Sequence, residues 1–508
     1  MSREQSQGMS NQKSKPKTKN NTFHNRNNQG NQKAHKKTTA SYGNKQHADN
    51  KGKQADEVKV GDRIVVTIKR IGINGEGVGY YKRKAVFIDG AIVDEVIKAK
   101  VTKVERSYLQ AEMIEIEKKS ASRQQPICEV YEQCGGCQLQ HMSYDAQLKA
   151  KEEIVREAFS RYTQLEKIEL KPIIGMDDPW HYRNKAQLQA GVQQQRLITG
   201  LYTAGTHKLI DISGCLVHDK AINEVYEKLK PILQKWNIEP CDERKREGVL
   251  KTIVVRIAKH TGKLQLTFVT ATDKLPHKEK LIEEINSALP NIISISQNIH
   301  KEKSSLVFGP TTFTLWGEEQ LEETLGNLKF ALSARAFFQL NPKQTIKLYD
   351  AAKEAAQLTG TELVIDAYCG TGTIGLWLAK QAKEVRGIEV IGEAVQDARR
   401  NAEASGISNA LFYEGRAETL LPKWLEQGMK PDVIVVDPPR TGLDFALIKA
   451  IKLAKPKRIV YVSCNPSTLA KDCQQLMEDG QYRLGIVQPV DMFPQTSNVE
   501  VVTYLEKK

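Results

Sequence analysis

The sequence lacks any apolar run close to the roughly 18 residues that a membrane-spanning helix requires. Its first 50 residues also lack the apolar centre of a secretory signal peptide, so we expect a cytoplasmic protein with no membrane association. Cysteine is scarce, with eight residues in a chain of 508. Such few and unevenly spread cysteines argue against a disulfide framework and favour metal binding or catalysis. No pattern indicates an obligate protein partner.

Positive charge is concentrated at one end of the chain. Residues 1–53 contain twelve Lys or Arg residues and two acidic residues, a net charge of +10 out of +14 for the whole chain. The segment is nearly free of large apolar residues and cannot offset the entropy cost of folding. We expect residues 1–55 to form a disordered basic tail, which either strengthens binding to phosphate backbones or only keeps the protein soluble.

Residues 56–118 show a different pattern, in which β-branched and polar residues alternate in short runs separated by glycines. This pattern predicts a small antiparallel β-barrel. Lysines and arginines cover the predicted surface, with Tyr80 and Tyr81 between them, as in a surface where cations hold phosphates and rings stack on bases. A charged barrel that binds nothing is the alternative. The segment resembles the TRAM domain, which favours RNA binding.

Three cysteines are close together in CEVYEQCGGC, and a fourth lies in ISGCLVHD. Three clustered thiolates and a distant one can complete a four-ligand site for a soft metal or a cluster. Structural zinc more often uses two separated pairs, so the layout favours an iron-sulfur cluster, whose role would be structural, RNA-binding or redox-sensing. Unrelated buried thiols are the alternative. The four residues are Cys128, Cys134, Cys137 and Cys215.

Residues 119–330 contain both amphipathic helix patterns and strand-like runs, such as QLKAKEEIVREAFSRY and KLQLTFVTA. We expect a central α+β domain that carries the iron-sulfur site. Within it, WHYRNK places Arg183, Asn184 and Lys185 at the start of a possible strand. These residues are either substrate contacts or a solvated turn.

Residues 331–508 have the strongest pattern. ELVIDAYCGTGTIGLWLAKQ reads as an apolar strand, a glycine-rich turn and a helix, and Gly370, Gly372 and Gly375 fit G-x-G-x-x-G. This motif is typical of a Rossmann-like nucleotide site. Glu389 ends a second predicted strand 19 residues after Gly370, where a carboxylate can bind both hydroxyls of a ribose.

Two further predicted strands, in DVIVVDPPRTG and RIVYVSCNPST, continue the alternating pattern of a doubly wound sheet. Ligands of such sheets bind at the carboxyl ends of the strands, so Asp437 and Cys464 should converge on the nucleotide crevice. A dehydrogenase would also use this fold, but it needs no thiol at a strand end. A thiol beside a methyl donor indicates covalent catalysis.

Five motifs resemble, in order, those of the S-adenosylmethionine-dependent RNA uracil-C5 methyltransferases. They are FFQLNP (337–342), DAYCGTGT (366–373), DPPR (437–440), SCNPST (463–468) and FPQTSNVE (493–500). With the barrel and the four cysteines, the resemblance covers about residues 56–505 and is closest to the enzymes that act on 23S ribosomal RNA. It implies a class I methyltransferase domain, an RNA partner and a [4Fe-4S] cluster on the four cysteines.

The resemblance also implies roles for individual residues. Cys464 is expected to add to C6 of uracil, which makes C5 nucleophilic, and Glu500 to remove the C5 proton after methyl transfer. Asp437 is expected to accept a hydrogen bond from uracil N3-H. Family members commonly have histidine where this chain has Asn498, so an orienting role at that position is in doubt. The implied contacts to the methyl donor are Gln339, Tyr368, Glu389 and Asp437.

Three other functions are compatible with parts of this pattern. A transfer RNA T-loop uracil methyltransferase would keep the chemistry, but such enzymes generally lack the barrel and the cluster. A catalytically silent RNA-binding assembly factor would have no need for Cys464 and Glu500. A methyltransferase acting on amino groups would explain the Asp-Pro-Pro sequence and leave the strand-end cysteine unexplained. The sequence therefore favours methylation of 23S ribosomal RNA.

Overall fold

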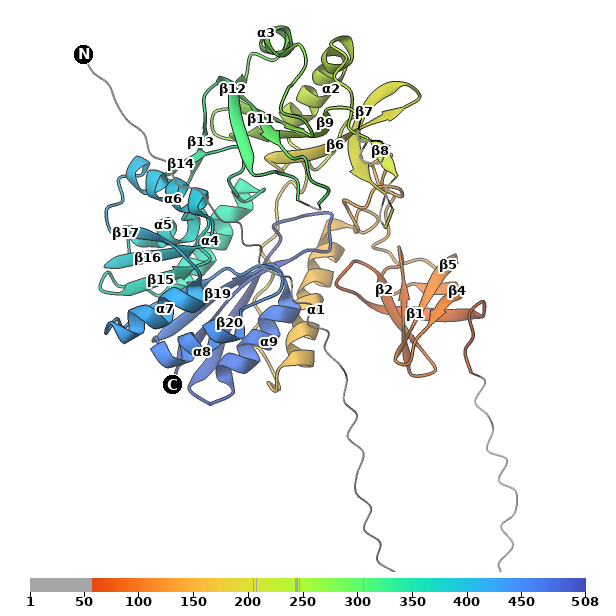
Figure 1. Ribbon diagram of the computed structural model, residues 1–508. Helices are drawn as coiled ribbons and strands as arrows, with labels where there is room; N and C mark the ends of the chain where they lie inside the picture. Colours follow the sequence, from red (N-terminus) through yellow and green to blue (C-terminus); the bar gives the residue numbers. More distant parts are fainter. Residues whose placement is uncertain (1–56, 204, 207, 243–244, 246, 305) are drawn as a thin grey trace, which may run out of the picture. The chain divides into compact units, whose positions relative to one another are not determined.

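The computed structural model describes residues 57–203, 205–206, 208–242, 245, 247–304 and 306–508. The predicted basic tail, residues 1–55, lies outside this range. Residues Val58–Lys508 form one unit. Along the chain they build a closed barrel, a seven-stranded sheet, a hairpin and a second seven-stranded sheet (Figure 1).

The barrel has the strand order β1-β2-β3-β5-β4. Residues along β1 alternate between the interior and the surface, and Ile64, Val66 and Ile68 are buried, as the alternating sequence predicts. Gly79 permits closure, because a Cβ there would lie 2.3 Å from Cγ1 of Val66. The strands are β1 (Arg63–Ile71), β2 (Gly77–Tyr81), β3 (Lys84–Ile88), β4 (Val96–Val104) and β5 (Tyr108–Lys118).

The prediction of an antiparallel barrel is wrong for one pair of strands. β3 and β5 run parallel, because β4 is antiparallel to both β1 and β5 and occupies the position between them. A chain that crosses from β3 to β4 before returning as β5 closes the barrel with one parallel seam. Turn residues do not reveal such a crossover.

The central sheet has the order β12-β11-β10-β9-β6-β7-β8. Helices α2 and α3 contribute Leu229 and Ile285 to a buried apolar cluster that also contains Ile253 and Phe268 of the sheet. This arrangement is the predicted α+β domain. Its elements are β6 (Lys185–Gln193), β7 (Arg196–Tyr202), β8 (Leu209–Asp211), α2 (Lys220–Lys235), β9 (Leu250–Ile257), β10 (Leu264–Thr270), α3 (Lys278–Ala288), β11 (Ile292–Ile299) and β12 (Thr311–Gly317).

Helix α1 (Tyr144–Tyr162) precedes the central sheet but packs elsewhere. Its residues Ile154, Val155 and Phe159 belong to the same buried cluster as Leu469 and Leu476 of helix α9 (Pro466–Met477). The helix therefore attaches the segment that follows the barrel to the C-terminal domain. Amphipathic periodicity predicts such a helix but not its packing partner.

The C-terminal sheet has the order β17-β16-β15-β18-β19-β21-β20, in which the first five strands are parallel. A hairpin of β13 (Leu321–Leu325) and β14 (Leu328–Leu332) precedes it. The strands are β15 (Leu363–Ala367), β16 (Glu384–Glu389), β17 (Ala410–Glu414), β18 (Val433–Val436), β19 (Arg458–Ser463), β20 (Tyr482–Val490) and β21 (Glu500–Lys507). The remaining helices are α4 (Pro342–Ala356), α5 (Thr373–Ala379), α6 (Gly392–Ala404), α7 (Ala417–Glu426) and α8 (Phe445–Ala454).

Helices cover both faces of this sheet (Figure 1). Successive residues of one strand accordingly belong to different cores: Val433 and Val435 pack with α4, α5 and α6, whereas Ile434 and Val436 pack with α7, α8 and α9. A strand buried on both faces needs a continuous apolar sequence, which VIVV provides. No helix in the described part of the chain is both long and apolar enough to cross a membrane.

Candidate active site

Polar residues gather at one edge of the C-terminal sheet. The carboxyl ends of parallel strands lie at the same edge, and Tyr368, Asp437 and Cys464 directly follow β15, β18 and β19. Glu389 is the last residue of β16. Glu500 begins β21, which is antiparallel to β19 with Ser463 opposite Val501, so Glu500 lies beside Cys464 at this edge. The structure thus brings these five predicted residues together.

The glycine-rich turn after β15 is shaped by backbone that favours glycine. Gly370 and Gly372 have φ angles of 54° and 81°, and a Cβ on Gly372 would lie 2.7 Å from the Phe412 ring. Glu389 fixes this turn, because its Oε2 accepts a hydrogen bond from the amide of Gly370 (3.1 Å). Its Oε1 accepts one from the amide of Ile391 (2.9 Å). The carboxylate is therefore held at the strand end.

Asp366 is a site residue that the sequence interpretation missed. Its Oδ2 accepts a hydrogen bond from the amide of Gly375 (2.7 Å), whereas its buried Oδ1 has no hydrogen-bond partner among the described residues. Burial raises the pKa of Asp366 to about 8, and the carboxylates of Asp437 and Glu389 add to that rise. The sequence contained a signal for this residue, because Asp366 stands near the end of β15, just before the glycine-rich turn.

Gln339 lies between the hairpin and α4, and it is buried. Asn184 holds this segment in place: its side-chain amide donates to O of Gln339 (3.1 Å), and its backbone amide donates to O of Leu340 (2.9 Å). Asn184 is itself buried, so the interpretation as a solvated turn is wrong for this residue. Its neighbour Lys185 is half-buried, and desolvation lowers the pKa of Lys185 to about 7.

Cys464 opens into a cavity of about 470 Å³ that is also lined by Arg440, Asn498 and the barrel residues Ile73 and Asn74. Burial raises the pKa of Cys464 to about 11, and the carboxylates of Glu500 and Asp437 contribute, while Arg440 opposes the rise. Burial likewise raises the pKa of Glu500 to about 8 and of Asp437 to about 7. Arg440 is the cation that opposes the rise at both Cys464 and Glu500.

Hydrogen bonds from two neighbouring segments fix Arg440. Its guanidinium donates to Oδ1 of Asn498 (2.9 Å). Its carbonyl accepts from the side-chain amide of Asn465 (3.0 Å), the residue that caps α9. Asn498 therefore has a structural role, as the acceptor that holds the Arg440 side chain. The side-chain amide acts as an uncharged acceptor, so this contact does not depend on pH.

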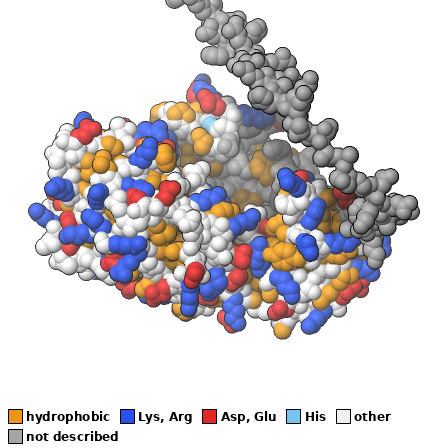
Figure 2. Space-filling model, turned by 90° about the horizontal axis from the view of Figure 1, so that it is seen from below, with side chains coloured by type: hydrophobic (Ala, Val, Ile, Leu, Met, Phe, Trp, Pro, Cys, Tyr) orange, Lys and Arg blue, Asp and Glu red, His pale blue; other side chains and the backbone are white. Residues whose placement is uncertain are grey.

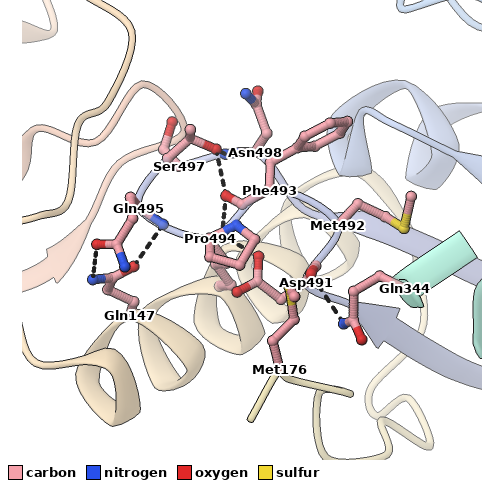
Figure 3. A network of polar contacts seen from close by, with 12 residues as sticks. Gln147, Met176, Gln344, Asp491, Met492, Phe493, Pro494, Gln495, Ser497 and Asn498 are labelled. Atoms are coloured by element: carbon pink, nitrogen blue, oxygen red, sulfur yellow. Dashed lines mark hydrogen bonds and ion pairs between the residues drawn. The ribbon is translucent and has the colours of Figure 1, made fainter. Parts of the chain in front are cut away.

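The loop before Glu500 is anchored by a dense network of polar contacts (Figure 3). Gln147 of α1 and Gln495 exchange two hydrogen bonds of 3.0 Å. The side-chain amide of Gln344 donates to O of Asp491 (3.0 Å). The carboxylate of Asp491 also pairs with the fully buried Lys151 at 2.5 Å. The loop is thus held from α1 and α4, which keeps Asn498 and Glu500 in register with Cys464.

We expect Lys151→Met to destabilise the protein by about 3–5 kcal/mol, because it leaves the buried Asp491 carboxylate without its cation. The control is Lys228→Met, which removes an exposed pair with Glu224 and should cost less than about 1 kcal/mol. Urea unfolding followed by tryptophan fluorescence measures both. Equal losses in the two variants would contradict the importance of the buried pair.

The four predicted ligand cysteines line one small cavity, together with Gln140, Arg183 and His218. Burial raises the pKa of Cys137 to about 12 and also raises the pKa values of Cys134 and Cys215. No group of three or more His, Cys, Asp or Glu side chains in the described ranges is arranged to hold a metal ion. Three buried atoms beside the thiols nevertheless have no hydrogen-bond partner among the described residues: Oε1 of Gln140, Nε of Arg183 and Nδ1 of His218.

Two regions of the chain match known families. Residues 316–508 match the family described as tRNA (Uracil-5-)-methyltransferase, and residues 57–114 match the TRAM domain. An RNA methyltransferase of Halalkalibacterium halodurans, named as uncharacterized, is 55% identical over 450 residues, which cover 88% of this chain and 97% of the relative. A similarly named protein of Bacillus cereus is 52% identical over 454 residues, covering 89% and 98% of the two chains.

A solved structure agrees with these matches. It is the tRNA (uracil-54, C5)-methyltransferase of Pyrococcus abyssi in complex with S-adenosyl-L-homocysteine, with 27% identity and a TM-score of 0.68, covering 87% of this chain and 100% of that chain. The predicted fold class, a Rossmann-like methyltransferase domain with an N-terminal barrel, is confirmed. The chain therefore belongs to the S-adenosylmethionine-dependent RNA uracil-C5 methyltransferases that carry a TRAM domain.

Proposed function

We propose that this enzyme methylates C5 of uridine in 23S ribosomal RNA, with Cys464 as nucleophile and Glu500 as base. The observation that carries the proposal is the pairing of β19 with β21, which sets Cys464 beside Glu500 at the strand edge that also bears Glu389. Asp437 lies at the same strand edge, and its carboxylate raises the pKa values of Cys464 and Glu500. Neither a silent RNA-binding factor nor a methyltransferase acting on amino groups needs a thiol and a carboxylate together at this edge.

The chemistry divides between the two residues. The Cys464 thiolate forms a bond to C6, and the C5–C6 π electrons move onto O4 as an enolate. C5 then forms a bond to the methyl carbon, and the electrons of the broken sulfur–methyl bond stay on the sulfur of the methyl donor. Glu500 removes the proton from C5, the C5–C6 double bond forms again, and Cys464 leaves as thiolate. The proton on Glu500 passes to solvent, which restores the enzyme.

Gln339, Tyr368, Glu389 and Asp437 are the proposed contacts to the methyl donor. S-adenosylmethionine supplies an electrophilic methyl group when bound. The residues fit it, because the Glu389 carboxylate is fixed at a strand end next to a glycine turn that permits close approach. Asp437 is proposed in addition to accept the hydrogen bond of uracil N3-H. Burial raises the pKa of Asp437 to about 7, so its carboxyl group gains or loses its proton near neutral pH.

The barrel and the surface chemistry support an RNA substrate. Lys and Arg side chains are spread over the face seen in Figure 2, mixed with acidic and apolar ones, and the match of residues 57–114 to the TRAM domain is the observation that supports RNA binding. The resemblance of the motifs to enzymes that act on 23S ribosomal RNA supports that substrate, whereas the barrel does not separate the two RNAs, because the similarity to the Pyrococcus abyssi protein covers 87% of this chain and extends into the barrel. Transfer RNA is the second candidate, because the structurally similar Pyrococcus abyssi protein is a tRNA (uracil-54, C5)-methyltransferase.

A competition assay tests the choice between the two RNAs. Equimolar 23S and transfer RNA transcripts are incubated with the enzyme and S-adenosylmethionine carrying a labelled methyl group, and 5-methyluridine is then quantified in each RNA. We expect the label in 23S ribosomal RNA. Label confined to transfer RNA would establish the second candidate.

We propose that Cys128, Cys134, Cys137 and Cys215 hold a [4Fe-4S] cluster. The four thiols line one cavity, and Nε of Arg183 and Nδ1 of His218, which have no hydrogen-bond partner among the described residues, lie beside them as donors for sulfur. A cluster is wider than one ion, so its ligands need not meet at a single point. When bound, it links the segment after the barrel to the central sheet, and a structural role is the one proposed.

Loss of one ligand should remove the cluster. We expect Cys215→Ser to lower iron and acid-labile sulfide in anaerobically purified protein at least about tenfold, because a serine hydroxyl is a poor ligand for iron-sulfur iron. Cys241→Ser is the matched control, since Cys241 lines a different cavity. Full iron content in Cys215→Ser would contradict the assignment, as would no iron in the parent protein.

The raised pKa values predict a rate that increases with pH. Cys464 reacts as thiolate and Glu500 as carboxylate, and their pKa values of about 11 and about 8 leave both mostly protonated at neutral pH. We expect kcat/KM to rise at least about tenfold between about pH 6.5 and 8.5. Arg440→Gln should shift the profile to higher pH, whereas Arg440→Lys, which keeps the charge, should shift it less. A flat profile would contradict both assignments.

A further inference from the structure

A second hollow adjoins the catalytic cavity. It has a volume of about 290 Å³ and lies between the barrel, α1 and the start of α9. Ile73 and Asn74, in the loop between β1 and β2, line both this hollow and the cavity of Cys464. Pro466 lines the cavity of Cys464, and the next residue, Ser467, lines the second hollow. The two spaces therefore adjoin the same barrel loop.

The barrel loop is held firmly at this junction. Oγ of Ser497, in the loop that precedes Glu500, donates a hydrogen bond to O of Ile73 (2.9 Å). The amide of Asn74 donates to Oε2 of Glu76 (3.0 Å). Gly75 lies so close to Gln138 that a Cβ would be 2.6 Å from the Cβ of that residue. The hollow is thus preformed and tied to the segment that carries the proposed base.

The walls of the hollow carry the groups that bind unpaired nucleotides. The guanidinium carbon of Arg161 lies over the ring of Tyr162, 5.7 Å from its centroid. Arg161 is exposed, so its guanidinium is accessible to a base. Arg70 of β1 forms an ion pair with Glu157 of α1, which lies one helical turn from Arg161. Stacking surfaces with neighbouring donors and acceptors are how proteins bind splayed RNA bases.

We propose that this hollow binds the nucleotide next to the target uridine, with its base stacked on Arg161. The inference rests on the proposed function, because it places the target base against Cys464. The phosphate backbone links the neighbouring nucleotide to the target uridine, so this nucleotide must lie next to the cavity of Cys464. The hollow occupies such a position, because it shares Ile73 and Asn74 with that cavity. The barrel then takes part in recognising the target and does more than tether distant RNA.

The experiment first traps the target. With S-adenosylmethionine present, pooled ribosomal and transfer RNA transcripts made with 5-fluorouridine should form a lasting adduct with Cys464, because C5 carries fluorine in place of a removable proton once the methyl group has been transferred. Nuclease trimming and sequencing of the attached oligonucleotide identify the site. Synthetic hairpins containing that site are then made with an abasic residue on either side of the target uridine, and KM and kcat for methylation are measured separately.

The variants are Arg161→Gln and, as control, Arg156→Gln, which removes the same charge from an exposed position of α1 outside the hollow. With the parent enzyme, one of the two abasic hairpins should raise KM at least about fivefold with little change in kcat. Arg161→Gln should raise KM for the intact hairpin and lose the sensitivity to the missing base. Arg156→Gln should keep it.

The outcomes separate the two proposals. No adduct and no methylation with any RNA would overturn the proposed function itself. Methylation that is indifferent to both neighbouring bases, or equal behaviour of the Arg161 and Arg156 variants, would overturn the stacking site and leave the proposed function standing.

Discussion

Cys464→Ala is expected to lower the rate of methyl transfer at least about 10³-fold and to leave RNA affinity within about twofold. Without the thiolate, no bond forms at C6, and C5 of uracil remains too weak a nucleophile to take a methyl group. Cys464 contributes little to the surface available for phosphate contacts, since it is one side chain in the cavity wall. Single-turnover transfer of labelled methyl groups, with RNA affinity measured in parallel, gives both quantities.

Cys464→Ser sharpens the interpretation, because it keeps the shape of the side chain while the hydroxyl is far harder to ionise. It should be as inactive as the alanine variant. Turnover in either variant at the parental rate would refute the covalent route.

Glu500→Gln is expected to stop the reaction one step later. The glutamine cannot take the C5 proton, so the methylated adduct should persist as a protein–RNA complex that survives denaturation. Denaturing electrophoresis with labelled RNA detects it, and the band should disappear when Cys464 is also replaced. Isosteric amide substitution preserves packing at this buried position, where Glu500 is 5% exposed.

Glu506→Gln provides the control from the same strand. Glu506 pairs with Arg458 and Arg483 at the far end of β21, remote from Cys464 in the register of the sheet. This variant should turn over normally and give no stable adduct. Absence of the adduct from Glu500→Gln, or its presence in Glu506→Gln, would remove Glu500 as the base.

Local sequence patterns were sufficient to predict most of the C-terminal fold. The run VIVV predicts a strand buried on both faces, and the glycine turn of residues 370–375 predicts a strand–turn–helix unit, both of which the structure contains. Strand ends of a parallel sheet share one edge, so the meeting of Asp437 with Cys464 could also be expected. These predictions succeed because the features depend only on residues close together in the sequence and on the parallel direction of the strands.

Other features depend on contacts between distant segments. Cys464 lies beside Glu500 only because β21 runs antiparallel to β19. Motif resemblance pointed to both residues, and no spacing rule gives their distance. The contact of Arg440 with Asn498 likewise joins two loops that are far apart in the sequence. The position of Asp366 before the glycine turn was visible in the sequence, but its role, fixing the amide of Gly375, depends on how the turn folds.

The central domain illustrates the same limit. WHYRNK gave no reason to prefer a buried position, yet Asn184 holds the backbone of Gln339 and Leu340. The cysteine spacing indicated a common site, and the four thiols do line one cavity. Packing of α1 against α9 could not be read from its apolar stripe, because a stripe shows that a helix is covered and not by what.

Mass spectrometric mapping of 5-methyluridine tests the central claim most directly. Ribosomal and transfer RNA are isolated from cells that produce the protein, from cells that lack it and from cells that produce only the Cys464→Ala variant. We expect 5-methyluridine at one or more positions of 23S ribosomal RNA in the first cells and unmodified uridine there in the other two. An identical set of 5-methyluridines in all three cell lines would contradict it.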